Sequence, residues 1–145
     1  MTKVYISTVI EAASADVWRV VRDFNGLPNW TPFATESRIE QGQSADQVGC
    51  IRNFRLRDGG VIRERLLALS DYDLSMSYAI LESPMPVEDY IASLSLTPIT
   101  DGNRTFAEWQ ADFDCAPDRE AALVQQIGAN VFQAGLTALK QRFRR

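Results

Sequence analysis

Residues 118–143 read DREAALVQQIGANVFQAGLTALKQRF. Apolar side chains recur in this stretch at intervals of three and four residues, which predicts one long amphipathic helix. Pro117 suits a first helical position, and Asp118 and Glu120 place negative charge where the helix dipole favours it. Lys140 and the arginines after it place positive charge at the C-terminal end, where the dipole favours cations. A helix of this length extends roughly 39 Å, so a wide layer of the protein must cover its apolar face.

Two glycines lie on that face. Gly128 and Gly135 are seven residues apart, so they share one side of the helix with Val131 and Phe132. Each glycine costs about 1 kcal/mol of helix propensity relative to alanine. Either the glycines let the helix backbone approach the sheet closely, or the missing side chains leave room for a ligand. All four residues are therefore candidate ligand-binding residues.

The segments upstream predict strands and two short helices. Residues 3–10 alternate in the β-branched pattern of a strand. Ser14 is a good N-cap for a helix that stops at Asn25-Gly26, and residues 27–30 form a turn or a second short helix. Asp58-Gly59-Gly60 is a strong hairpin signal. Further strands are expected at residues 34–41, 48–57, 61–70, 74–82, 87–98 and 105–115.

This order of elements predicts an α+β fold. A seven-stranded, curved antiparallel sheet would close around the long C-terminal helix, and the two short helices after the first strand would cover its open end. A chain of 145 residues, of which 46% are hydrophobic, is expected to form one domain over residues 1–145.

Composition argues against several classes of function. Fifteen Lys and Arg against nineteen Asp and Glu give a net charge of -4, so the overall field repels phosphate backbones and no nucleic-acid partner is expected. The N-terminus lacks the apolar region of a signal peptide, and no run of eighteen apolar residues occurs, which predicts a cytoplasmic protein without membrane insertion. Monomer and homodimer both stay open.

The chain contains no histidine. Ser-His-Asp and Cys-His mechanisms and His-ligated zinc are therefore excluded. Cys50 and Cys115 lie far apart without a CxxC spacing, so they are expected to be reduced structural thiols. The carboxylates show no calcium-loop spacing, and Asp58-Gly59-Gly60 fits a hairpin rather than a phosphate loop. We expect no metal and no cofactor.

Strand alternation places two opposite charges inside the sheet. On 48–57, Arg52 shares a face with Cys50, Phe54 and Leu56, and on 61–70 Glu64 shares one with Ile62 and Leu66. An isolated buried charge is costly. Two interpretations remain: Arg52 and Glu64 satisfy one another inside the sheet, or a polar ligand group or water completes the pair.

The other inward side chains are mainly aromatic. Tyr78, Tyr90 and Trp109 fall on the inner face of their strands, and Trp109 alternates with charged and polar neighbours. This composition suits a pocket of about 300 to 1,000 Å³ for an apolar ligand oriented by a few hydrogen bonds. The candidate ligand-binding residues are Trp30, Arg52, Phe54, Glu64, Tyr78, Tyr90, Trp109, Gly128, Val131, Phe132 and Gly135.

Other aromatic and proline residues have less decided roles. Trp18 is expected to anchor the first helix. Trp30 and the segment Pro84-Met85-Pro86 either pack in the core or line the entrance to the pocket.

In its order of elements and in several short motifs, the chain resembles the START-like or Bet v 1-like helix-grip superfamily, in particular its bacterial polyketide cyclase/dehydrase-type members. The resemblance spans nearly the whole chain and implies the helix-grip fold with a ligand pocket. It is more specific for fold than for chemistry. The matching pieces are Val17-Trp18, Trp30-Thr31-Pro32-Phe33, Val48-Gly49-Cys50-Ile51-Arg52, Glu64-Arg65-Leu66, Tyr78, Pro86 with Tyr90, and Gly135-Leu136.

The plant abscisic-acid receptors are more distantly similar, since they also carry Val-Gly-Cys followed by Glu-Arg-Leu on the next strand. The chain departs from them at two places. Thr35 stands where their pocket lysine falls, and Arg57-Asp58-Gly59-Gly60 replaces their Gly-Leu-Pro gate. Hormone-type carboxylate capture and gate closure onto a phosphatase are therefore not implied.

Three functions follow as hypotheses. The first is binding of a small hydrophobic, aromatic or lipid-like molecule between the sheet and the C-terminal helix. The second is a polyketide cyclase or dehydratase in which Glu64 or Tyr90 moves protons and Arg52 stabilises an enolate. The third is a protein-interaction module that docks an acidic partner through four arginines on the outer face of one hairpin. These are Arg55, Arg57, Arg63 and Arg65.

Overall fold

One curved antiparallel sheet of seven strands forms the frame of the molecule. A computed structural model describes residues 1–145, and the strand order is β1-β7-β6-β5-β4-β3-β2. All strands after β1 follow one another as a meander, and β1 pairs with β7 at the far edge. The strands are β1 (Thr2–Ile10), β2 (Ala34–Ile39), β3 (Ile51–Leu56), β4 (Val61–Ser70), β5 (Ser75–Glu82), β6 (Glu88–Ile99) and β7 (Arg104–Asp114).

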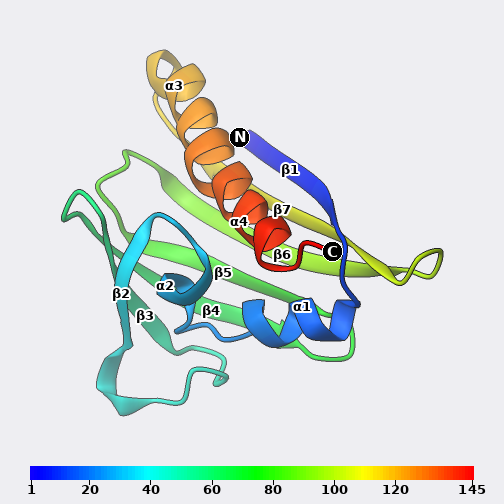
Figure 1. Cartoon of the computed structure of the whole chain (residues 1–145). Coiled ribbons are helices and arrows are strands. Elements are labelled where there is room, and N and C mark those ends of the chain that lie inside the picture. Colours follow the sequence, from blue (N-terminus) through cyan, green and yellow to red (C-terminus); the bar gives the residue numbers. More distant parts are fainter.

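Helices cover the inner face of this sheet. The long C-terminal helix crosses it beside β1, while α1 (Ser14–Val21) packs against β6 and β7 and α2 (Leu27–Trp30) packs against β2 (Figure 1). A short 3₁₀-helix, η1 (Glu40–Gly42), follows β2. The predicted α+β helix-grip arrangement is confirmed, and the strand boundaries differ from the predicted ones by a few residues.

The C-terminal helix is continuous but not α-helical throughout. It consists of a 3₁₀ turn, η2 (Pro117–Arg119), then α3 (Glu120–Gln125), a π-helical segment, η3 (Gln126–Gln133), and α4 (Ala134–Arg142). Pro117 occupies an early helical position as predicted. The π-helical turns were not expected, because apolar periodicity over eight residues does not separate i→i+5 from i→i+4 hydrogen bonding.

The prediction that Ser14 caps α1 is wrong. The N-cap is Ala13, and no side chain caps this helix end. The Ser14 hydroxyl instead lies 2.9 Å from Oγ1 of Thr105, which donates to the carbonyl oxygen of Ala12 over 2.8 Å. These buried bonds tie the start of α1 to β7, because a hydroxyl that is removed from water must find a partner.

The predicted sorting of strand faces is confirmed. Buried side chains alternate with more exposed ones along β3, β4 and β7, as a period of two requires. Twenty-nine buried hydrophobic residues form one cluster between the sheet and the helices. Trp18 belongs to it, and its indole Nε1 also donates to Asp71 over 2.8 Å, so this residue anchors α1 to the turn after β4.

Gly135 marks a close approach, and Gly128 does not. A Cβ atom at Gly135 would lie 2.7 Å from Cζ3 of Trp109 and 3.4 Å from Cζ3 of Trp30. At Gly128 it would lie 3.5 Å from Cγ1 of Val4, an ordinary contact. The close-approach interpretation therefore describes Gly135, where protein atoms take the room left by the missing side chain.

This difference gives a matched pair of variants. Gly135→Ala forces the Trp109 ring to move. Because this ring is stacked on Phe132 with centroids 4.7 Å apart, we expect a loss of about 1–3 kcal/mol in unfolding free energy. Gly128→Ala meets only ordinary contacts and gains helix propensity, so we expect no loss and a gain of up to about 1 kcal/mol. Urea unfolding of both variants measures the difference. Equal effects at the two positions would contradict this packing.

Candidate functional site

An apolar cavity lies between the sheet and the C-terminal helix. Its volume is about 30 Å³, which holds one or two water molecules. The sequence-based expectation of about 300 to 1,000 Å³ is therefore wrong for this conformation, because side chains fill most of the predicted pocket. The lining residues are Leu27, Phe33, Arg52, Phe54, Leu56, Ile62, Glu64, Tyr78, Ile80, Met85, Tyr90, Trp109 and Val131.

The lining changes in character from the outside inwards. Five half-buried apolar side chains form what we call the mouth: Phe33, Leu56, Ile80, Met85 and Val131. They come from the segment after α2, from β3, β5 and the turn that follows it, and from η3. The fully buried end carries the polar groups. The cavity therefore has an apolar mouth and a polar floor.

Arg52 and Glu64 form the floor as a buried ion pair. They face one another on the paired strands β3 and β4, and only 3% and 5% of their surfaces are exposed. Nε of Arg52 donates to Oε1 of Glu64 over 2.7 Å, and Nη2 lies in ion-pair contact with the same oxygen, also at 2.7 Å. Nη1 donates to the carbonyl oxygen of Phe24 over 3.1 Å. The guanidinium also lies over the Phe24 ring, 4.0 Å from its centroid, so the cation is held from several sides.

Two oxygens of the floor have no partner. The hydrogen bond and the ion-pair contact from Arg52 both go to Oε1 of Glu64, which leaves Oε2 free. The Tyr90 hydroxyl makes no hydrogen bond either, although only 4% of the residue is exposed. Trp30 Nε1 is the one side-chain nitrogen or oxygen that is both sealed from solvent and without a partner. The oxygens of Glu64 and Tyr90 therefore border open space, and both residues line the cavity.

Irregular sheet geometry lies beside both residues. The β4–β5 register shifts between Arg63 and Glu64, and the β6–β7 register shifts between Glu88 and Ile91, around Tyr90. Asp89, next to Tyr90, has a φ of 51°, which is uncommon outside glycine. Bulges of this kind redirect side chains and are frequent beside functional sites. They are an observation independent of the cavity itself.

Tyr78 and Trp109 complete the aromatic wall. The Trp109 indole donates to the Tyr78 hydroxyl over 2.9 Å, and the Trp109 ring stacks on Phe132. Burial raises the pKa of Tyr78 and Tyr90 well above the usual tyrosine value, so both hydroxyls stay protonated. Burial also raises the pKa of Glu64, and the charge and hydrogen bonds of Arg52 oppose that rise.

The structure brings seven of the predicted ligand-binding residues together and leaves four outside the cavity lining. Arg52, Phe54, Glu64, Tyr78, Tyr90, Trp109 and Val131 line it. Trp30, Gly128, Phe132 and Gly135 do not, because they pack behind Trp109 or against β1. A ligand role for any of the eleven stays a prediction.

Several residues that line the cavity are not among the eleven predicted ligand-binding residues. Leu27 and Phe33 flank Trp30 in the segment around α2, where no strand alternation indicates a direction. Met85 was considered only as a core or entrance residue, and the structure places it at the mouth.

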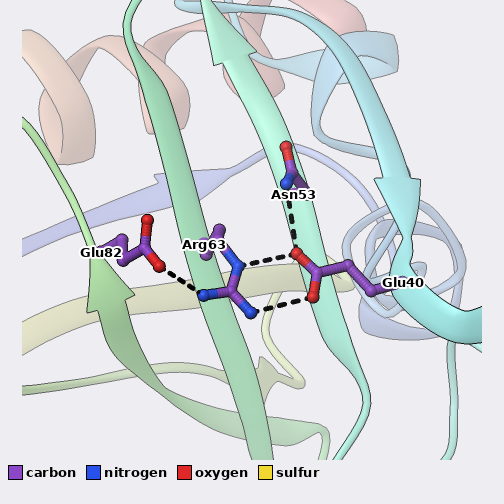
Figure 2. A network of polar contacts seen from close by, with 4 residues as sticks. All are labelled: Glu40, Asn53, Arg63 and Glu82. Carbon is purple, nitrogen blue, oxygen red and sulfur yellow. Dashed lines mark hydrogen bonds and ion pairs between the residues drawn. The ribbon is translucent and has the colours of Figure 1, made fainter.

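The outer face of the same strands carries a separate ionic network. Arg63 donates through Nε and Nη2 to Glu40 over 2.7 and 2.9 Å, and through Nη1 to Glu82 over 2.6 Å. Asn53 also donates to Glu40 (Figure 2). Arg55 pairs with Glu36, and Nε of Arg57 donates to the carbonyl oxygen of Pro32. Three of the four arginines that the interaction hypothesis needs are therefore engaged within the protein.

The structure has neither a metal-binding cluster nor a helix suited to cross a membrane. No three His, Cys, Asp or Glu side chains gather in an arrangement that could hold a metal ion. None of the helices combines the length and the hydropathy that a membrane crossing requires.

Comparison with known proteins places the chain in a family. Residues 1–144 match the family described as polyketide cyclase/dehydrase and lipid transport. The chain belongs to this family. The resemblance to START-like proteins inferred from the sequence is thereby confirmed, and with it an association of the fold with ligand binding in general.

Solved structures agree with this assignment. Protein XoxI from Bacillus cereus is 26% identical, with a TM-score of 0.89 over 99% of this chain and 96% of that one. A protein from Thermobifida fusca is 30% identical, with a TM-score of 0.89 over 99% and 93% of the two chains. A START superfamily protein from Mycobacterium smegmatis shares the fold at 13% identity, with a TM-score of 0.77 over 97% and 96%.

The buried pair predicts a strong coupling between two substitutions. Arg52→Met leaves Glu64 as an unpaired buried charge, so we expect a loss of about 3–5 kcal/mol in unfolding free energy. Adding Glu64→Leu removes that charge, and the double variant should recover most of the loss. Urea unfolding of the two single variants and the double variant gives the coupling energy. If the two single losses in unfolding free energy simply added up in the double variant, the floor would not be a paired, desolvated one.

The outer network predicts a pH dependence. Hydrogen bonds from Arg63 and then Asn53 lower the pKa of Glu40 from 4.5 to about 2. Because the folded state holds the ionised form, its contribution to stability is complete above about 4.5 and is lost as the pH falls towards about 2. Glu40→Gln should be less stable than the wild type at neutral pH, and this difference should shrink on acidification. Unfolding at several pH values measures it, and a constant difference would contradict the network.

Proposed function

We propose that the protein binds a small hydrophobic molecule in the cavity between the sheet and the C-terminal helix. The observation that carries this proposal is the pair of unpartnered oxygens, on Glu64 and Tyr90, at the floor of an otherwise apolar cavity. Neither oxygen has a hydrogen-bonding partner within the protein, and neither is sealed off, since Trp30 Nε1 is the one sealed side-chain atom without a partner. Polar groups that border an apolar cavity in this way are suited to orient a ligand.

Binding requires the mouth to open, because the present volume holds only water. Met85 is the most adaptable side chain there, since its unbranched thioether has three rotatable bonds. It lies in the turn between β5 and β6, which touches the β3–β4 turn: a Cβ at Gly60 would lie 3.2 Å from Cγ of Pro84. Movement of these two turns away from η3 would enlarge the cavity without disturbing the Arg52–Glu64 floor.

A catalytic role ranks second. The raised pKa of Glu64 favours a proton-transfer role, and a cyclase or dehydratase could use it. Each nitrogen of Arg52, however, already lies within 3.1 Å of a protein oxygen, as a hydrogen-bond donor or in ion-pair contact. Stabilisation of an enolate by Arg52 would therefore compete with Glu64, and the geometry supports ligand binding better than this mechanism.

A filled cavity should abolish binding. N-phenyl-1-naphthylamine is an uncharged hydrophobic probe whose fluorescence rises on burial, and we expect saturable, one-to-one binding to the wild type. Val131→Trp places a large ring at the mouth and should reduce the fluorescence increase at least tenfold. Asn130→Trp adds the same ring at an exposed neighbouring position of η3 and should leave binding unchanged. Binding that does not saturate, or that survives Val131→Trp, would contradict the proposal.

A further inference from the structure

We propose that the cavity selects an uncharged ligand that carries a hydroxyl group and rejects ligands that present a carboxylate. This inference rests on the proposed function and adds the chemical class of the ligand. It follows from which atoms of the floor are already satisfied and which are free.

The charges of the floor are balanced before any ligand arrives. Arg52 and Glu64 are the only charged residues among the thirteen that line the cavity. Nε of Arg52 donates to Glu64, Nη2 lies 2.7 Å from the same carboxylate oxygen, and Nη1 donates to the Phe24 carbonyl. The aromatic rings of Phe24 and Tyr78 lie 4.0 and 4.6 Å from the guanidinium carbon. The cation is therefore enclosed by protein partners and offers no nitrogen without an acceptor.

The free atoms favour a hydrogen-bond donor. Oε2 of Glu64 is a carboxylate oxygen and only accepts. The Tyr90 hydroxyl can donate as well as accept. A ligand hydroxyl can donate to Oε2 and at the same time accept from Tyr90, so it can satisfy both atoms. A ketone or ether can use only the Tyr90 proton and leaves Oε2 unpaired.

A ligand carboxylate meets the opposite situation. It has no proton for Oε2, and it would bring a second negative charge against Glu64 in a poorly hydrated space. Like charges are repelled more strongly there than in water. To reach Arg52 it would have to displace Glu64 from a hydrogen bond and an ion-pair contact, both of 2.7 Å. The arginine on the floor is thus a support for Glu64 and not a receptor for acidic ligands.

The test uses three probes with one carbon frame: p-xylene, p-cresol and p-toluate, titrated at pH 7.5 and followed by NMR shifts of amides around the cavity. We expect p-cresol to bind about tenfold or more tightly than p-xylene, since hydrogen bonds to charged groups contribute that much or more. We expect p-toluate to bind at least tenfold more weakly than p-cresol.

Tyr90→Phe provides the matched variant. It deletes a hydroxyl that has no protein partner and keeps the ring that stacks on Phe113, with centroids 5.9 Å apart, so the fold should be unaffected. The affinity for p-cresol should fall about three- to tenfold, while that for p-xylene should hold or rise. An equal change in affinity for all three probes would overturn the proposal that Tyr90 hydrogen-bonds to the ligand hydroxyl.

The outcomes separate the two proposals. If none of the probes shifts the cavity amides and the naphthylamine probe also fails, the proposed function fails and this inference with it. If p-xylene and p-cresol bind equally, the cavity is a ligand site and selection of a hydroxyl group is overturned. Tightest binding of p-toluate would overturn it as well, and would show that Arg52 leaves Glu64 to meet an anion.

Discussion

The ion pair between Arg52 and Glu64 is the constraint on which the inner side of this molecule depends. Two charges at 3% and 5% exposure are stable together only because each has hydrogen-bonding partners and the cation lies between aromatic faces. That requirement fixes β3 against β4 and draws the loop carrying Phe24 onto the sheet, through its carbonyl oxygen and its ring. The aromatic cluster and the cavity are arranged around this fixed point.

The same two strands carry a second set of charges on their other face. Arg63 and Glu64 are neighbours in sequence, yet one side chain joins the half-exposed network with Glu40 and Glu82, and the other lies in the core. Alternation along a strand makes this separation automatic. The outer pairs contribute little each and are screened by salt, whereas the inner pair is sensitive to the loss of either partner. One hairpin therefore has an outer face on which loss of a charge costs little stability and an inner face on which it costs much.

Much of this arrangement could be predicted from the sequence because a period of two is a strong signal. Alternation along residues 48–57 and 61–70 was enough to place Arg52 and Glu64 inside, and the length of the C-terminal helix implied a wide, curved sheet. The register shifts at Glu64 and Tyr90 leave no local signature, so the free oxygens could not be foreseen. Cavity volume could not be foreseen either, since it depends on how Trp109, Trp30 and Phe132 settle around Gly135. The role of Ser14 was misjudged because its partner, Thr105, is distant in sequence.

The π-helical segment Gln126–Gln133 bears on how this protein family can change in length. A π-helical turn holds one residue more than the α-helical turn it replaces. Loss of one residue anywhere in the segment would let it return to α-helical hydrogen bonding, and the helix on either side would keep its orientation towards the sheet. In a regular α-helix the same deletion would rotate all later side chains by about 100°. The C-terminal helix thus contains a segment in which a single-codon deletion can be accommodated without loss of the core, and this segment includes Val131, which forms part of the mouth of the cavity.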